Sequence, residues 1–117
     1  MYENLAKELK KNIEVMTNTF EANNLQLLHL TVKPYSEEDA DCSILVEVAT
    51  ISGTDIPRNG LNIKINLYDE NDELYLTEAY YINDESFSGY DTYEINCYDD
   101  SKTLKKAVKG RLYITRN

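Results

Sequence analysis

The side chains best able to do chemistry in this sequence begin with its one histidine, His29. A histidine that acts as a general base needs a nucleophile within hydrogen-bond reach, and no Ser or Cys motif along the chain supplies one. Leu28 and Leu30 flank His29 in an apolar run, which is typical of a strand histidine near the surface. The sequence lacks hydrolase elbows, glycine-rich phosphate loops and zinc-binding spacings, so we predict no enzymatic activity, no catalytic residues and no cofactor.

Asp69, Asn71 and Glu73 alternate like the first ligands of a calcium-binding loop. Helix-loop-helix calcium sites require glycine at the sixth position and glutamate at the twelfth, where this chain has Leu74 and Tyr80. Apolar alternating runs, typical of strands, lie on both sides of the segment. We therefore predict a hairpin turn without a metal site here, with a weak calcium site as the alternative.

Cys42 and Cys97 are the only two cysteines, and each falls on the apolar face of a predicted strand. Their separation resembles that of the cysteine pair that joins the two sheets of immunoglobulin-like sandwiches. We expect both thiols to stay reduced in a cytoplasmic protein, and the alternatives are a disulfide or a metal or redox site.

The net charge of −9 is distributed very unevenly. Residues 65–101 hold eleven acids, seven tyrosines and no Lys or Arg, whereas residues 102–117 hold six bases and no acid. Phosphate contacts need Lys and Arg, so we predict no nucleic-acid binding. The acidic segment is either a set of solvated hairpins that favour solubility or a docking face for a basic protein partner.

Residues 2–22 are predicted to form one amphipathic helix that ends at Asn23–Asn24, because Asn tolerates the left-handed conformation. Its apolar stripe follows a period near 3.6 and consists of Leu5, Leu9, Ile13, Met16 and Phe20. We expect this stripe to pack on the following domain. The alternative is that the helix pairs with its twin in a homodimer or lies in a partner's groove.

From Leu25 the apolar period changes to two, which indicates strands. The predicted strands are 25–33, 42–51, 61–68, 74–82, 91–98 and 111–116. The residues expected on their inner faces include Leu28, Leu30, Val32, Cys42, Ile44, Val46, Val48, Tyr93, Ile95 and Cys97. A short helix is expected after the cap at 99–101, with Gly110 as its end.

The chain length of 117 residues suits one domain, in which a helical segment 1–24 and a β-rich segment 25–117 form a single folding unit. No run approaches the roughly 20 apolar residues that span a bilayer, so we predict no membrane insertion. Glu3, Lys7 and Glu8 interrupt the apolar residues of the N-terminus, which is unlike a secretory signal. The expected location is cytoplasmic if Met1 is the native start.

The segment Ile65–Asp69 resembles the motif that names the FxLYD family of immunoglobulin-like bacterial domains, an aromatic, any residue, then Leu-Tyr-Asp. Leu67, Tyr68 and Asp69 match this motif, and Ile65 stands where Phe is usual. The neighbouring turns also resemble those of the family, and the resemblance covers residues 42–98. It implies an immunoglobulin-like fold and a role in recognition, and it carries no catalytic residues.

These observations predict a single antiparallel β-sandwich of the immunoglobulin-like kind, with an N-terminal amphipathic helix across one face or edge. The alternative is an α+β fold in which the helix packs on one curved antiparallel sheet.

For function, we predict a non-enzymatic bacterial module that binds a protein partner, one that is basic, through acidic, tyrosine-rich hairpins. The predicted contact residues are Tyr68, Tyr75, Tyr80, Tyr81 and Tyr90. The alternative is a small acidic inhibitor or nucleic-acid mimic of phage or mobile-element origin.

Overall fold

The computed structural model describes residues 1–117, and strands are the main secondary structure. The elements in chain order are α1 (Glu3–Lys11), β1 (Ile13–Val15), α2 (Thr17–Glu21), β2 (Leu25–Pro34), β3 (Cys42–Thr50), β4 (Leu61–Tyr68), β5 (Leu74–Ile82), β6 (Tyr90–Cys97), α3 (Thr103–Lys106) and β7 (Lys109–Arg116). The longest helix, α1, has nine residues, and none of the helices is long and apolar enough to cross a membrane.

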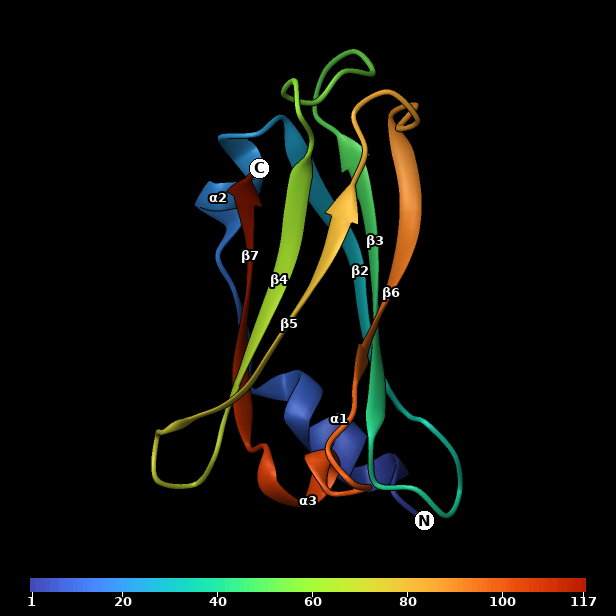
Figure 1. Cartoon of the computed structure of the whole chain (residues 1–117), viewed down its shortest axis with the longest axis vertical. Coiled ribbons are helices and arrows are strands. Elements are labelled where there is room, and N and C mark those ends of the chain that lie inside the picture. The colour runs from blue at the N-terminus through green and yellow to red at the C-terminus, as the bar shows by residue number, and fades with distance from the viewer.

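Two separate sheets pack face to face, and this confirms the predicted β-sandwich (Figure 1). One sheet has the strand order β1-β7-β4-β5, and the other has the order β2-β3-β6. The alternative with one curved sheet is wrong, because the strands divide between two sheets. All neighbouring strands are antiparallel except β1 and β7, which run parallel.

The core lies between the two sheets and consists of residues that alternate along the strands. In β4 the inward residues Leu61, Ile63, Ile65 and Leu67 are all fully buried, and the outward residues between them are half-buried. Each buried Leu or Ile side chain contributes about 1.5–3 kcal/mol to folding. The inner faces predicted for β3 and β6 are confirmed, and they consist of Cys42, Ile44, Val46, Val48, Tyr93, Ile95 and Cys97.

The prediction of one helix over residues 2–22 is wrong. The helix α1 ends at Lys11, β1 follows it, and α2 is a second helix of five residues. The amide of Met16 donates to the carbonyl of Leu112 at 2.9 Å, and the amide of Gly110 donates to the carbonyl of Asn12 at 3.1 Å. Pairing with β7 therefore satisfies backbone groups that a continuous helix would have satisfied internally.

The two N-terminal helices cover one side of the sandwich. Both α1 and α2 contact β2 of one sheet and β7 of the other; α2 lies beside β7 near one end of the sandwich, and α1 lies near the opposite end, next to α3 (Figure 1). Ala6, Leu9 and Phe20 bury their side chains there, whereas Leu5 of the predicted stripe is 42% exposed. Of the predicted stripe, Leu9, Ile13 and Phe20 are buried, so the expectation that the stripe packs on the β domain is confirmed for these three residues.

Two further predictions fail because of local irregularities. Leu28 is exposed, whereas Leu30 is half-buried and Val32 is buried, since the register of β2 shifts between Leu27 and His29. A β-bulge of this kind moves the side chains beyond it to the other face.

Gly110 lies inside β7 and does not end the short helix α3. A Cβ atom at this position would lie 2.8 Å from the carbonyl oxygen of Asn66 on β4. The glycine is therefore required by the close approach of two strands.

Candidate binding surface

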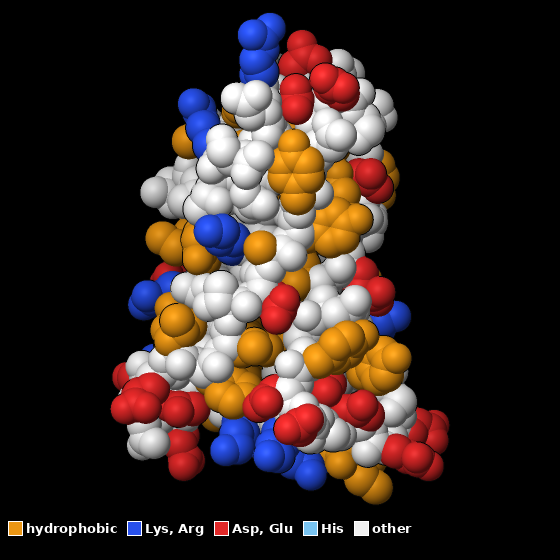
Figure 2. All heavy atoms as spheres, viewed as in Figure 1, with side chains coloured by type: hydrophobic (Ala, Val, Ile, Leu, Met, Phe, Trp, Pro, Cys, Tyr) orange, Lys and Arg blue, Asp and Glu red, His pale blue; other side chains and the backbone are white.

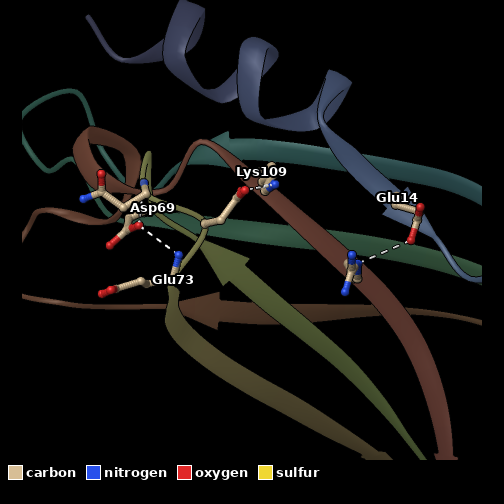
Figure 3. Close-up of polar contacts among 7 residues, drawn as sticks. Glu14, Asp69, Glu73 and Lys109 are labelled. Carbon is tan, nitrogen blue, oxygen red and sulfur yellow. Dashed lines mark hydrogen bonds and ion pairs between the residues drawn. The ribbon is translucent and has the colours of Figure 1, made fainter.

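The turn between β4 and β5 is organised by the side chain of Asp69 (Figure 3). Its Oδ1 accepts hydrogen bonds from the backbone amides of Asn71 at 2.8 Å and Glu73 at 3.1 Å. Asp72 adopts a left-handed backbone with φ of 63°, which short polar side chains tolerate. The predicted hairpin turn is therefore confirmed, and one oxygen of the Asp69 carboxylate accepts hydrogen bonds from the turn's own amides.

A shallow polar groove of about 390 Å³ lies beside this turn on the outer face of the four-stranded sheet. Lys109 forms an ion pair with Asp72, and Arg111 Nε lies 3.4 Å from Glu14 Oε1 (Figure 3). The Arg111 guanidinium also lies over the ring of Tyr68, with its carbon 5.5 Å from the ring centroid. Each cation of the groove is thus matched by an anion from the same chain, so the groove offers little net charge to a ligand.

The five predicted contact tyrosines do not share one face. Tyr68 and Tyr81 lie on the outer face of the four-stranded sheet, at opposite ends, because they alternate with the buried Leu67 and Ile82. Tyr90 belongs to the other sheet, where its hydroxyl donates to Glu47 Oε2 at 2.6 Å. The strand β5 nevertheless supplies three of the five, Tyr75, Tyr80 and Tyr81, of which Tyr80 and Tyr81 are exposed.

Tyr75 and Tyr80 turn toward β6 from the two ends of β5. The Tyr75 hydroxyl donates to the Asp99 carboxylate, and burial followed by this bond raises the pKa of Tyr75. The ring of Tyr80 packs on Tyr93, with centroids 4.9 Å apart, and remains 41% exposed. The hydroxyl of Tyr81 donates to the carbonyl of Asn59 at 3.1 Å. These contacts hold the rings in place, which lowers the entropy that binding would cost.

The strand β5 is an edge strand, since it pairs only with β4. It has nine residues, contains neither Pro nor Gly, and carries a single charge, Glu78. Glu78 lies opposite the fully buried Ile65, and directly opposed residues of an antiparallel pair project to the same face. Its carboxylate is therefore directed inward at the sandwich rim, where it is half-buried and forms no ion pair or hydrogen bond.

Acidic turns stand at both ends of β5. One is the β4–β5 turn with Asp69, Glu70, Asp72 and Glu73, and the other follows β5 at Asp84 and Glu85. In Figure 2 acidic groups gather over the β4–β5 turn at the lower left, over the loop after β2 at the lower right, and at the upper end. The face between them is mostly uncharged and shows hydrophobic groups. We call the β5 edge with Tyr75, Glu78, Tyr80, Tyr81 and these two turns the β5 surface.

A row of hydrogen-bonded polar side chains on the outer face of the other sheet was not predictable from local sequence patterns. His29 Nδ1 lies 2.8 Å from Glu47 Oε1, and Tyr90 donates to the second oxygen of the same carboxylate. The bond from Tyr90 and then the bond from His29 lower the pKa of Glu47. The histidine side chain is 80% exposed, so the carboxylate can orient it but nothing shields the pair from water. The prediction of a surface histidine on a strand is confirmed.

The two cysteines lie in one sheet rather than in two. Cys42 on β3 is directly opposite Cys97 on β6, both are fully buried, and both are free thiols. The likeness to an inter-sheet pair is therefore wrong, because residues 55 apart can be neighbours along one antiparallel ladder. The hydrogen bond with Cys42, together with burial, raises the pKa of Cys97, so the thiol is a poor nucleophile.

A second feature without a sequence signal is the buried carboxylate of Asp41, just before β3. It accepts hydrogen bonds from the amides of Asp99 at 2.9 Å and Ser101 at 3.1 Å, and from the hydroxyl of Thr103 at 2.8 Å. Burial raises the pKa of Asp41, but these bonds outweigh burial and keep the pKa below its usual value. The carboxylate therefore joins the start of β3 to the segment after β6.

No three side chains of His, Cys, Asp or Glu lie close enough together to hold a metal ion. Comparisons of the chain with protein-family models, with curated proteins and with solved structures find no match. The resemblance to the FxLYD domains thus stays a prediction that rests on the motif residues alone.

Proposed function

We propose that this protein is a non-enzymatic module that binds a basic segment of a protein partner on the β5 surface. One observation carries the proposal: the long edge strand β5, paired with β4 on one side only, presents fixed, exposed tyrosines between two acidic turns. Edge strands present unpaired backbone groups. In natural proteins such strands are usually short, covered by another element, or protected by charged side chains.

The chemistry of the β5 surface suits recognition. Tyrosine provides large contact area with few rotatable bonds, and its hydroxyl tolerates the rim of an interface. The acidic turns would steer a cationic partner toward the strand and raise its association rate. Tyr80 and Tyr81 are 41% and 46% exposed, so their rings still have apolar area to bury.

The placement of the acids favours this proposal over a nucleic-acid mimic. A mimic of a phosphate backbone would carry acids in rows at regular spacing along the surface. Here they gather on turns at the two ends of the molecule, and the strands between carry few of them (Figure 2).

The wider setting follows from the resemblance and from the sequence. We infer an immunoglobulin-like domain of the FxLYD kind, bacterial and cytoplasmic, and the role of Asp69 in its turn supports the motif. In that compartment the paired thiols would stay reduced.

The proposal is tested by comparing what three immobilised forms of the chain retain from a bacterial lysate. The forms are the wild type, the double variant Tyr80→Thr plus Tyr81→Thr, and the control Tyr35→Thr, whose exposed ring lies outside the β5 surface and packs on Tyr98. Threonine preserves strand propensity.

We expect wild type and control to retain the same protein, which the double variant loses. About 1 M salt, where the screening length falls to about 3 Å, should release it. Retention that is equal for all three forms and insensitive to salt would remove the proposal.

A further inference from the structure

We propose that the partner segment pairs with the free edge of β5 as an additional strand, antiparallel or parallel. This proposal rests on the proposed function. The segment is an extended peptide with a Lys or Arg that faces Glu78. This mode of recognition gives affinity through backbone hydrogen bonds and specificity through alternate side chains.

The edges of the two sheets differ in how much they offer to such a strand. The edge strand β1 has only three residues, and β2 is covered by α1 and α2. The edge strand β6 has its inward residues Tyr93, Ile95 and Cys97 already buried. In β5 the inward residues Leu76 and Glu78 are half-buried and Tyr80 is exposed, so an added strand has surface left to cover.

Glu78 determines the charge that the added strand must carry. Its carboxylate is half-buried, faces the inner side of the edge, and has no cation from its own chain. A strand added to β5 would place every second side chain on this same side. A Lys or Arg opposite Glu78 would pair with it in a partly desolvated site, where the attraction exceeds that in water.

A second copy of the chain is a poor occupant of this edge. Glu78 is the central residue of β5, which runs from Leu74 to Ile82. Two copies paired antiparallel over the full strand would place two Glu78 carboxylates opposite each other, and like charges directly opposite are destabilising. The same pairing would set the acidic β4–β5 turn of one copy against Asp84 and Glu85 of the other.

The pattern of side chains along β5 defines a matching peptide. Opposite the inner row it needs a central cation, flanked by apolar residues that cover Leu76 and Tyr80. Cations at its ends would face the acidic turns. A capped nine-residue peptide meets this pattern with lysine at positions one, five and nine, valine at three and seven, and threonine between.

The first experiment measures binding of this peptide and the hydrogen exchange of the β5 amides by NMR. We expect the amides of β5 that are directed away from β4 to gain protection on binding, while those bonded to β4 change little. Two further peptides test the backbone pairing directly: one is N-methylated at the odd positions and the other at the even positions, so that each lacks one row of backbone donors. Only the one that blocks the donors facing β5 should lose binding, because the other row of donors faces solvent.

The second experiment tests the role of Glu78. We expect Glu78→Gln to weaken binding about five-fold, the effect of a half-exposed ion pair. The control Glu94→Gln makes the same change of charge on the outer face of β6 and should bind as the wild type does. A peptide with glutamate at its centre should lose binding to the wild type and regain part of it with Glu78→Lys.

The outcomes separate the two proposals. Strand addition is overturned if the peptide binds without protecting the β5 amides and both methylated peptides bind equally well. If that binding still depends on Tyr80 and Tyr81, the proposal of a binding module stands. Protection of β5 with equal affinity for Glu78→Gln and Glu94→Gln overturns the pairing with Glu78. Failure of the peptide to bind overturns strand addition, and the lysate comparison then decides the module by itself.

Discussion

The two sides of the sandwich, where the edges of its sheets meet, are built differently. On one side α1 and α2 contact β2 and β7, and β1 pairs with β7 (Figure 1). On the other side no element covers β5 and β6, which contact each other through side chains such as Tyr80 and Tyr93. The first side is closed by the amphipathic N-terminal segment, whereas on the second side β5 pairs with β4 along one backbone edge and leaves the other edge free.

The N-terminal helices cover the edge strand β2, whereas no helix or strand covers the free edge of β5. The covered side buries Leu9 and Phe20 almost completely, as a core does. The open side keeps Tyr80 and Tyr81 partly exposed and sets one inward carboxylate in the middle of the strand. An inward charge is a known protection of edge strands against self-pairing. Under the proposed function, this inward charge would disfavour pairing with a second copy and favour a cationic partner.

The largest effect should come from opening the covered side. Phe20→Ala removes a fully buried ring from α2 and should lower the free energy of unfolding by about 3–5 kcal/mol. The matched substitution on the open side, Tyr81→Ala, should cost less, about 1 kcal/mol, since Tyr81 is already 46% exposed in the folded protein. Urea denaturation of both variants measures the difference. Equal losses would mean that the two sides do not differ in burial.

An intermediate effect is expected at the polar closure made by Asp41. Asp41→Asn should cost about 2–3 kcal/mol at pH 7, because the buried amides and hydroxyl lose part of their charged acceptor. The folded pKa of Asp41 is lowered from its usual value of 3.8. The stabilisation is therefore fully present above about pH 4 and is lost as the pH falls through the lower, folded pKa.

The gap in urea midpoint between wild type and Asp41→Asn should accordingly narrow as the pH is taken below 4. The exposed Asp55→Asn serves as control, since it makes the same charge change without a hydrogen-bonded side chain, and should follow the wild type. A gap that stays constant down to about pH 2 would contradict a charged role for Asp41.

The smallest change in stability, but a clear change in association, is expected on the open side. Glu78→Thr should alter the free energy of unfolding by about 0.5 kcal/mol or less, because the carboxylate is half-buried and makes no ion pair. It should increase self-association in sedimentation velocity, since the edge then lacks its inward charge. Glu94→Thr removes a charge from β6 and should not have this effect. Equal sedimentation of both variants would show that Glu78 does not guard the edge.

The strands were the part of the fold that the sequence could predict. The bounds of β4 and β5 agree with the expected 61–68 and 74–82, because β4 alternates strictly and the turn between the two strands consists of turn-forming residues. The break in the N-terminal helix is not predictable from the sequence, because Ile13, Met16 and Phe20 fit a helical period as well as they fit a strand and a second helix. Only the parallel pairing of β1 with β7 decides between the two.

The candidate surface was predictable in its residues but not in its arrangement. Composition identified the tyrosines and the missing cations of residues 65–101, and local turn chemistry identified Asp69. The separation of Tyr90 from Tyr80 and Tyr81 depends on which sheet each strand joins. The hydrogen bonds of the Asp41 and Glu47 carboxylates join residues 18 to 62 positions apart, so no local sequence pattern predicts them.

The sequence by itself determined that the chain forms alternating strands, a single hairpin turn at Asp69 and an acidic, tyrosine-rich middle, because these depend on neighbours within a few residues. Tertiary structure decided the division into two sheets, the breaking of the N-terminal helix, the pairing of Cys42 with Cys97 in one ladder and the exposure of β5. These features depend on backbone pairing and packing between segments far apart in the sequence, so local sequence patterns do not specify them.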